Sequence, residues 1–226
     1  MHTQVQAAKA ALRKEIKSRL AAIPAEQIAI ESGLVLQRLR DLKVYRDAKA
    51  VSVYLSMKGE VETKEIVKDI FAQGKLCFVP RWDGQIMHMV HLTSLPDYLS
   101  LPLNRWGIPE PPHGEERQVA FPDGKGGGFR ESGEKLDLVL VPGVAFDSHR
   151  NRLGHGKGYY DSYLARYARL THNDTDDPLF AMPTTVALAL RAQIVESVPV
   201  GETDWRVDEV LTADGVVKDA QYGGST

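Results

Sequence analysis

Residues 151–161 (NRLGHGKGYYD) carry the residue types that an anion-binding turn needs. Glycines let backbone N–H groups approach an anion closely, and a helix that starts here would add partial positive charge. Arg152 and Lys157 would supply full positive charges. The segment therefore predicts a phosphate-binding cradle. The alternative is a tight turn in which the glycines serve only backbone geometry and the cations are solvated.

The position of this segment supports a ligand site. Residues 136–146 (LDLVLVPGVAF) are the most apolar run and predict a central strand before the segment, and residues 156–170 predict a helix after it. Ligands of open parallel sheets bind at the carboxyl ends of strands, where loops meet helix N-termini. The segment matches neither G-x-x-x-x-G-K-[ST] nor G-x-G-x-x-G, so generic nucleotide motifs do not explain it.

The surrounding sequence predicts an α/β fold. Residues 50–57 and 75–82 are typical of buried strands, and Thr63 is expected to cap a helix between them. A strand, a helix and a strand form a right-handed βαβ unit with parallel strands. Two helices come earlier, the second opening at Pro24 and ending at about residue 43. Further strands are expected at 87–92, 184–190 and 208–217.

The first helix is expected to have two distinct faces. An apolar stripe recurs at the helical period, and a basic stripe recurs every four residues on another face. By itself, such a basic stripe is usually a solvated helix face. The apolar stripe consists of Leu12, Ile16, Leu20 and Ile23, and the basic stripe of Lys9, Arg13 and Lys17.

The composition is that of an ordinary globular protein. Of 226 residues, 43% are hydrophobic and 26% are charged, which excludes disorder for the bulk of the chain. The formal net charge of −2 provides no general attraction to nucleic acid or membranes, so any anion site must be local. One cysteine, Cys77, excludes an intrachain disulfide. We expect a single domain over 1–226, with mobile insertions at 124–134 and 171–183.

The sequence favours a cytoplasmic protein. The N-terminal residues lack the apolar core of a signal peptide, and no apolar run approaches the roughly 18 residues that span a bilayer. No acidic residue occurs before Glu15, so a mitochondrial address stays open. We expect a monomer whose partners are small molecules.

The glycine-rich segment is also similar to the signature of one enzyme family. Its pattern RLG-x-G-x-GYYD, following PG-x-AFD at 142–147, resembles the 5-formyltetrahydrofolate cyclo-ligases. This resemblance implies a three-layer α/β/α fold with a central, mostly parallel sheet that is Rossmann-like and NagB/RpiA/CoA transferase-like. Similar stretches elsewhere are K-x-x-LR at 9–13, YLSMKGEVET at 54–63, WGIPEP at 106–111, and Gln193 followed by VPVGETDWRVDEVLT at 198–212.

The same resemblance implies a role for individual residues. Arg152 and Lys157 would be catalytic, by contacting the transferring phosphoryl group. ATP would be bound by Lys9, Ala10, Ala11, Leu12, Arg13, Arg152, Leu153, Gly154, His155, Gly156, Lys157, Gly158, Tyr159 and Tyr160. The folate substrate would be bound by Arg13, Leu55, Glu60, Trp106, His155, Gly156, Lys157, Gly158 and Tyr159.

Two acidic residues are the expected magnesium ligands. Asp161 and Asp204 correspond to aspartates of the family pattern, and Mg²⁺ needs only one or two carboxylates beside ATP phosphates. Asp208 lies close in sequence and could replace Asp204. Taken alone, Asp161 could instead stabilise a helix N-terminus, and Asp204 could cap a loop.

The implied reaction converts 5-formyltetrahydrofolate to 5,10-methenyltetrahydrofolate with release of ADP and phosphate. It proceeds through an N5-iminium phosphate, and such transfer depends on positioning and charge rather than on a nucleophilic side chain. An acid/base role for His155 is left open. The alternatives are a non-catalytic folate- or nucleotide-binding relative and an unrelated sugar-phosphate or nucleotide phosphotransferase.

Overall fold

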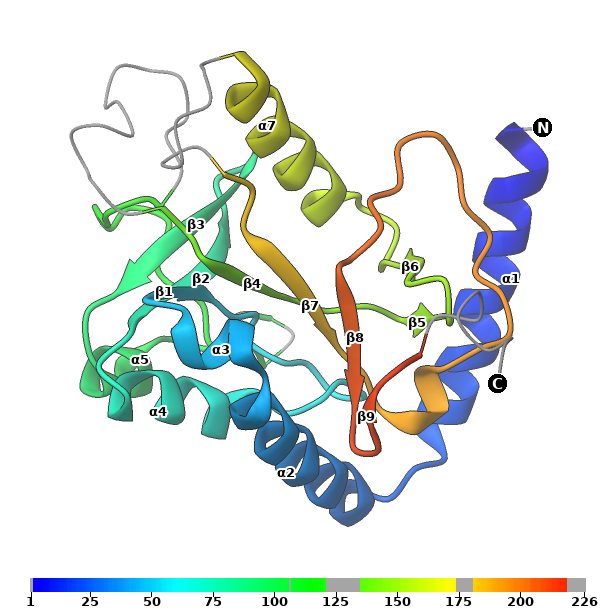
Figure 1. Ribbon diagram of the computed structural model, residues 1–226, viewed down its shortest axis with the longest axis horizontal. Coiled ribbons are helices and arrows are strands. Elements are labelled where there is room, and N and C mark those ends of the chain that lie inside the picture. The colour runs from blue at the N-terminus through cyan, green and yellow to red at the C-terminus, as the bar shows by residue number, and fades with distance from the viewer. Residues whose placement is uncertain (1, 106, 121–134, 174–180, 219–226) are drawn as a thin grey trace.

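A computed structural model describes residues 2–105, 107–120, 135–173 and 181–218. Within these residues a seven-stranded sheet has the order β3-β2-β1-β4-β7-β8-β9, and both edge strands, β3 and β9, run antiparallel to their neighbours (Figure 1). The five strands between them are parallel, so the predicted mostly parallel sheet is confirmed. The strands are β1 (Ala50–Ser52), β2 (Leu76–Trp82), β3 (Met87–Leu92), β4 (Leu138–Val141), β7 (Thr184–Leu188), β8 (Glu209–Thr212) and β9 (Gly215–Val216).

Helices cover both sides of this sheet. In Figure 1, α2 and α4 lie on one side and α7 on the other, which confirms the three-layer prediction. The helix α2 packs against β8 and α4, while α7 contacts β3. The described helices are α1 (His2–Ala21), α2 (Ala25–Asp41), α3 (Lys43–Asp47), α4 (Lys64–Ala72), α5 (Leu95–Ser100), α7 (Tyr159–Asn173) and the short 3-10 helix η2 (Arg191–Gln193).

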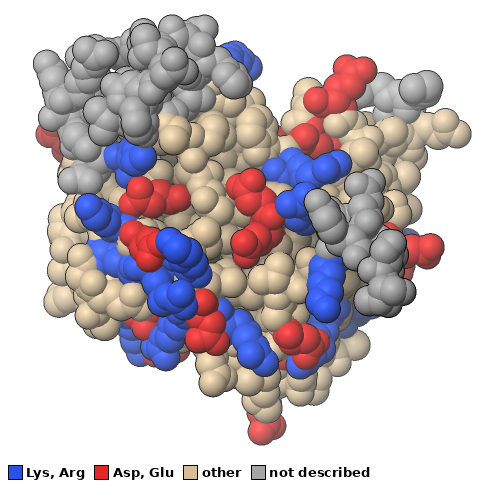
Figure 2. Space-filling view, viewed as in Figure 1, with Lys and Arg blue, Asp and Glu red and all other residues tan. Residues whose placement is uncertain are grey.

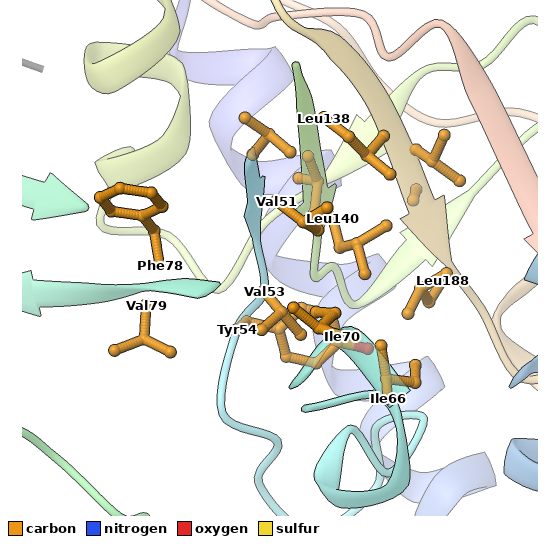
Figure 3. Close-up of a cluster of buried hydrophobic side chains, with 14 of the residues drawn as sticks. Val51, Val53, Tyr54, Ile66, Ile70, Phe78, Val79, Leu138, Leu140 and Leu188 are labelled. Carbon is orange, nitrogen blue, oxygen red and sulfur yellow. The ribbon is translucent and has the colours of Figure 1, made fainter. Parts of the chain in front are cut away.

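The main core includes the packing of α4 against the sheet. Ile66 and Ile70 are fully buried and point from α4 toward Val53 and the strands (Figure 3). Their spacing of four residues places both on one helical face. Truncating a side chain at such a site to alanine typically costs about 2–5 kcal/mol.

The predicted strand 136–146 is wrong in one respect that matters for function. It ends at Val141, and a short hairpin of β5 (Ala145–Phe146) and β6 (Arg152–Leu153) follows. The break falls at Gly143, where a Cβ atom would lie 2.5 Å from Phe146 Cζ. Only glycine allows the chain to turn this close to the ring.

Other boundaries also differ from the predictions. The predicted strand 208–217 is the β8–β9 hairpin, since Gly215 at φ 118° turns the chain back. The predicted strand 50–57 is regular only as far as Ser52, and the buried chain then continues irregularly. Thr63 occupies the N-cap position of α4, but its hydroxyl donates to Tyr54 O at 2.7 Å instead of capping the helix.

The predicted insertions lie largely outside the described residues. This holds for 124–134 and for 174–180, whereas residues 171–173 belong to the end of α7. The single-domain organisation stays a prediction. No helix in the described ranges is both long and apolar enough to cross a membrane. Cys77 is fully buried, and burial raises the pKa of its thiol to about 12, as suits a small apolar side chain in a strand.

The charged side chains show no single-sign surface in the view of Figure 2. Lysine and arginine lie beside aspartate and glutamate over this face. The absence of a general basic field agrees with the formal net charge of −2. Local concentration of cations must therefore be sought inside a cavity.

Candidate active site

A cavity of about 560 Å³ opens where several elements meet beside the sheet. In Figure 1 the loop from η2 to β8 passes between α7 and α1, and all three contribute to the walls. The glycine loop 154–158 and the turn between β2 and β3 complete them. The charged lining residues are Lys9, Arg13, Lys157, Arg166, Arg169, Asp161 and Asp204.

The helix α1 is held over the cavity by a second, smaller core. Ile16 is fully buried against Leu153 of β6, and Leu12 and Leu20 pack beside it. This arrangement confirms the predicted apolar stripe. Because α1 extends beyond this core at its N-terminal end, it carries Lys9 and Arg13 to the cavity wall.

The two cations of α1 make contacts with distant parts of the chain. Arg13 Nε donates to Gly154 O at 2.8 Å, which attaches the helix to the glycine loop. Lys9 Nζ lies 2.6 Å from Asp204 Oδ1, and Lys9 is only 6% exposed. Ala10 and Ala11 are exposed and do not belong to the described cavity lining. Leu12 packs in the smaller core. The predicted contacts of these three residues with ATP stay predictions.

Arg152 lies beneath the glycine loop rather than in the cavity. Its side chain is 4% exposed, and its Nη2 donates to Asp161 Oδ1 at 2.7 Å. A Cβ atom on Gly154 would lie 3.0 Å from Arg152 Nη1, so glycine allows the loop to cross over the guanidinium. This geometry argues against direct contact of Arg152 with a phosphoryl group. In this structure Arg152 holds Asp161, and its expected contact with the transferring phosphoryl group stays a prediction.

The β5–β6 hairpin that carries Arg152 is fixed by a buried carboxylate. Asp147 is fully buried and accepts hydrogen bonds from the backbone of Asn151 and from its side-chain amide, both at 3.0 Å. It also accepts from Val198 N at 2.9 Å. The turn is therefore joined to the segment that leads toward Asp204.

Lys157 is the exposed cation of the glycine loop. It lines the cavity and makes no hydrogen bond or ion pair with any residue that the structure describes. Gly156 at φ 101° and Gly158 at φ 66° adopt backbone conformations that favour glycine. They place Lys157 immediately before the N-terminus of α7, where helix dipole and side-chain charge act together on an anion.

The two predicted metal ligands lie close to each other. Asp161 Oδ1 accepts from Trp205 N at 3.0 Å, which brings the residue after Asp204 against Asp161. Both carboxylates line the cavity. Among the described residues no group of three or more metal-ligating side chains occurs, and magnesium bound with a nucleotide does not require one. The pair fits this type of metal site.

Asp208, the alternative metal ligand, serves the fold instead. Its Oδ2 accepts from Thr185 N and from Thr185 Oγ1, both at 2.7 Å. It does not belong to the described cavity lining. The structure therefore favours Asp204 over Asp208.

Glu60 and His155 form a contact beside the glycine loop. His155 Nε2 lies 2.9 Å from Glu60 Oε1, and Glu60 Oε2 accepts from Met57 N at 3.0 Å. Glu60 is buried with Leu55, whereas the His155 side chain is 46% exposed. This contact joins the chain after β1 to the glycine loop, two segments to which the resemblance assigns folate-binding residues.

Aromatic rings line one wall of the cavity. Trp82, the last residue of β2, packs on Tyr159 with ring centroids 4.5 Å apart and planes inclined by 32°. Tyr160 is buried in the core. Burial is the main cause that raises the pKa of its hydroxyl, and the negative charge of the nearby Glu60 raises it further. Trp106 lies outside the described residues.

Comparison with known proteins assigns the chain to a family. The model of the 5-formyltetrahydrofolate cyclo-ligase family matches residues 5–213. The chain belongs to the 5-formyltetrahydrofolate cyclo-ligase family. The match contains Lys9, the glycine loop and Asp204, so the site described above lies wholly within it.

Individual members of the family are similar over nearly their whole length. The 5-formyltetrahydrofolate cyclo-ligase of Mus musculus is 43% identical over 93% of this chain and 96% of the mouse protein. A probable cyclo-ligase of Caenorhabditis elegans is 32% identical over 92% and 93%. The NMR structure of Aquifex aeolicus 5,10-methenyltetrahydrofolate synthetase has a TM-score of 0.71 at 27% identity, covering 96% of this chain and 95% of that one.

The sequence prediction missed part of this cyclo-ligase cavity. Trp82 could have been found from its place at the end of a parallel strand, where ligand sites form. Arg166 and Arg169 follow Tyr159 at intervals of seven and ten residues, which places all three near one face of a helix. The roles of the predicted residues as ligands stay predictions.

Proposed function

We propose that this chain catalyses the ATP-dependent conversion of 5-formyltetrahydrofolate to 5,10-methenyltetrahydrofolate, releasing ADP and phosphate. The observation that carries the proposal is one cavity in which Lys9, Arg13 and Lys157 face the acidic pair Asp161 and Asp204. Family membership supplies the folate substrate. The cavity can bind the triphosphate of ATP next to this folate substrate.

The chemistry requires activation of an unreactive carbonyl. Nitrogen lone-pair donation blunts the N5-formyl group, whose oxygen would otherwise have to leave as hydroxide. In the proposed reaction the formyl oxygen attacks the γ-phosphorus and the bond to ADP breaks, giving an N5-iminium phosphate. N10 then attacks the formyl carbon and loses its proton to solvent, and the carbon–oxygen bond breaks to release phosphate. Each oxygen and phosphorus atom is accounted for.

The side chains in the cavity suit the first step. Lys157 and Arg13 are placed to neutralise phosphate oxygens, and the N-terminus of α7 adds backbone donors. Phosphoryl transfer depends mainly on such positioning and charge. Lys9 can join them if its ion pair with Asp204 opens.

Asp161 and Asp204 are the residues that would hold Mg²⁺. The chemistry that it would supply there is a reduction of the negative charge on the phosphate oxygens. Arg152 holds Asp161 from below at 2.7 Å, so the carboxylate keeps its orientation. Its second oxygen, Oδ2, accepts no hydrogen bond from any described residue.

The folate would occupy the side of the cavity near the aromatic pair. Trp82 and Tyr159 offer apolar ring faces to a planar heterocycle. Glu60, which is buried and already contacts His155, would bind a polar edge of the pterin. Leu55, which precedes Glu60 in the same segment, is also buried.

A direct assay tests the proposal. Purified protein is mixed with Mg-ATP and 5-formyltetrahydrofolate, and the absorbance of the methenyl product is followed. Turnover that needs both ATP and the folate supports a cyclo-ligase. Folate binding by calorimetry without turnover would support the non-catalytic relative. If the folded protein neither binds nor converts the folate, both the cyclo-ligase and the non-catalytic relative are contradicted.

We also propose a monomeric, single-domain protein in the cytoplasm. The described helices and strands are arranged around one principal sheet, which supports a single domain. Light scattering would measure the oligomeric state. Cell fractionation would decide between the cytoplasm and a mitochondrial address.

A further inference from the structure

The segment that carries Asp204 is fixed at both of its ends. It spans residues 199–206 of the loop from η2 to β8, and its residues are exposed or half-buried. The residues that flank it, Val198 and Val207, are only 3% and 2% exposed. Both flanking residues donate their backbone N–H groups to the turn 147–151, which joins β5 to β6. In Figure 1 the loop curves around this hairpin.

The first anchor of the segment is the carboxylate of Asp147. Its Oδ2 accepts from Val198 N at 2.9 Å and from the side-chain amide of Asn151 at 3.0 Å. Its Oδ1 accepts from the backbone N–H groups of His149 and Asn151, both at 3.0 Å. The carboxylate is fully buried, so it depends on these donors for its stability. It therefore fixes the shape of the turn and the position of Val198 together.

The second anchor is Arg150, whose backbone conformation is unfavourable for its residue type. Its φ of 64° lies in the left-handed region, which favours glycine or asparagine. Its carbonyl oxygen accepts from Val207 N at 3.2 Å, and its Nη1 donates to Asp208 O at 3.0 Å. Glycine would relieve the backbone but could not make the contact with Asp208. A strained residue with a long-range contact points to a role beyond the turn itself.

The middle of the segment is held by two contacts at the cavity. Trp205 N donates to Asp161 Oδ1 at 3.0 Å, and the carboxylate of Asp204 accepts from Lys9. In the proposed reaction Lys9 can leave Asp204 for a phosphate group. The two anchors lie outside the described cavity lining, so the binding of a ligand does not compete for them. They stay in place when the ion pair opens.

We propose that Asp147 and Arg150 are positioning residues for the magnesium site. They hold the segment 199–206 so that Asp204 stays beside Asp161 while the metal binds. This inference rests on the proposed function, which assigns the two cavity carboxylates to Mg²⁺. A segment that is already ordered loses less conformational entropy on binding, so the anchors raise the affinity for the metal.

The inference separates metal binding from folate binding. The residues assigned to the folate, among them Glu60 and Trp82, lie on segments that neither anchor contacts. Loosening the segment 199–206 should therefore weaken binding of the metal with the nucleotide and leave the folate affinity unchanged. A residue that only supports the fold would lower both affinities or neither.

The variant Arg150→Asn tests the second anchor. Asparagine tolerates the left-handed backbone, so the midpoint of thermal unfolding should stay unchanged or rise. The contact with Asp208 is lost, so backbone amides of residues 199–206 should exchange with deuterium about threefold faster, as measured by mass spectrometry. The Kd for Mn²⁺ with a non-hydrolysable ATP analogue, measured by electron paramagnetic resonance, should also rise about threefold.

Two variants control this measurement. Arg150→Lys keeps a long cationic side chain and should retain part of the lost Mn²⁺ affinity. Arg46→Asn removes a similar contact elsewhere, because the exposed guanidinium of Arg46 donates to Asp41 O at 2.6 Å. This second variant should change neither the exchange of residues 199–206 nor the Mn²⁺ affinity.

The variant Asp147→Asn tests the first anchor. The asparagine oxygen can still accept from the backbone of His149 and Asn151, but its amino group then faces Val198 N. This N–H group loses its acceptor, so the Kd for Mn²⁺ with the ATP analogue should rise about tenfold. Circular dichroism shows whether the variant is folded, and if it is not, Arg150→Asn decides alone.

The outcomes separate this inference from the proposed function. Unchanged deuterium exchange and Mn²⁺ affinity in Arg150→Asn would overturn the inference. Equal losses of affinity for Mn²⁺ and for 5-formyltetrahydrofolate, the latter measured by calorimetry, would also overturn it. So would lower thermal stability with the Mn²⁺ affinity of wild type. None of these measurements needs turnover, whereas a wild-type protein without turnover would contradict the proposed function itself.

Discussion

Two carboxylates of this protein are both ion-paired, yet their surroundings differ. Asp97, in the scaffold at α5, accepts both ends of the Arg117 fork at 2.7 and 2.8 Å and is also bound by Thr93 N at 2.8 Å. Asp204, at the cavity, is held by the ammonium of Lys9 and by Gly201 N. The scaffold pair is locked by a rigid fork and local backbone. The cavity pair depends on one lysine from a distant helix.

This difference separates a permanent ion pair from an exchangeable one. Lysine is a compact charge on a flexible stem, so its ammonium can turn from a carboxylate to a nucleotide phosphate. Once Lys9 moves to phosphate, both Asp204 oxygens lose a donor and can face a metal ion. We infer that Lys9 stays ion-paired with Asp204 until Mg-ATP binds.

The largest effect is expected at Asp161, the other carboxylate of the cavity. Asp161→Asn should reduce kcat by at least about 100-fold, because it removes the charge that the proposed function assigns to holding the metal. The fold should survive, since asparagine can still accept from Trp205 N. The methenyl absorbance assay measures the rate. Wild-type turnover would exclude Asp161 as a ligand.

Replacing Lys9 breaks the exchangeable pair directly. Lys9→Met should lower kcat/KM for ATP by about 10–100-fold, because a phosphate contact is lost. It should also strengthen binding of Mn²⁺ in the absence of nucleotide, because Asp204 is freed. Electron paramagnetic resonance measures free Mn²⁺. The control Lys14→Met removes an exposed lysine from the same helix. If Lys9→Met binds Mn²⁺ no more tightly than wild type, the proposed exchange is contradicted.

The locked pair should show itself in stability rather than activity. The Arg117 guanidinium, more than any other group, lowers the pKa of Asp97 to about 2. A carboxyl whose pKa is depressed on folding stabilises the protein above its unfolded pKa of about 3.9, and this is lost as pH falls toward 2. Asp97→Asn should therefore lower the free energy of unfolding by about 1–2 kcal/mol at pH 7.

Urea unfolding at several pH values measures this contribution. The difference between Asp97→Asn and wild type should shrink between pH 4 and pH 2, and turnover at pH 7 should stay unchanged. Asp41→Asn, at an exposed position at the end of α2, provides the control. If the difference in free energy of unfolding between Asp97→Asn and wild type does not change with pH, the ion pair of Asp97 with Arg117 does not stabilise the fold.

The smallest effect is expected at His155. Glutamine can still donate to Glu60 over a similar distance, so His155→Gln should change kcat by less than about threefold. The pH–rate profile should also keep its shape. A loss of more than about 100-fold would instead indicate acid/base catalysis by His155.

Local patterns in the sequence predict much of this architecture. The apolar stripe of α1, the βαβ unit of β1, α4 and β2, and the central position of β4 all follow from periodicity and apolar runs. Lys9 and Arg13 were found because a four-residue spacing and a family motif coincide. Such features depend on neighbours in the sequence, which a sequence analysis can see.

Features that depend on distant contacts were less accessible. Arg152 looks like a phosphate ligand in the sequence, but the Gly143 turn folds it under the loop against Asp161. Trp82 and Arg169 lie far from the glycine loop in the chain and meet at one cavity only after folding. No local sequence pattern predicts which of several exposed cations will line the same cavity.

The long separation between partners in the cavity has a consequence for protein synthesis. Arg13 contacts Gly154, which is 141 positions later, and Lys9 contacts Asp204, which is 195 positions later. While the chain is being translated, α1 can form early but has neither partner until most of the sheet exists. A ribosome stalled before residue 204 therefore carries a nascent chain whose first helix can be made while Asp204, the partner of Lys9, is still missing.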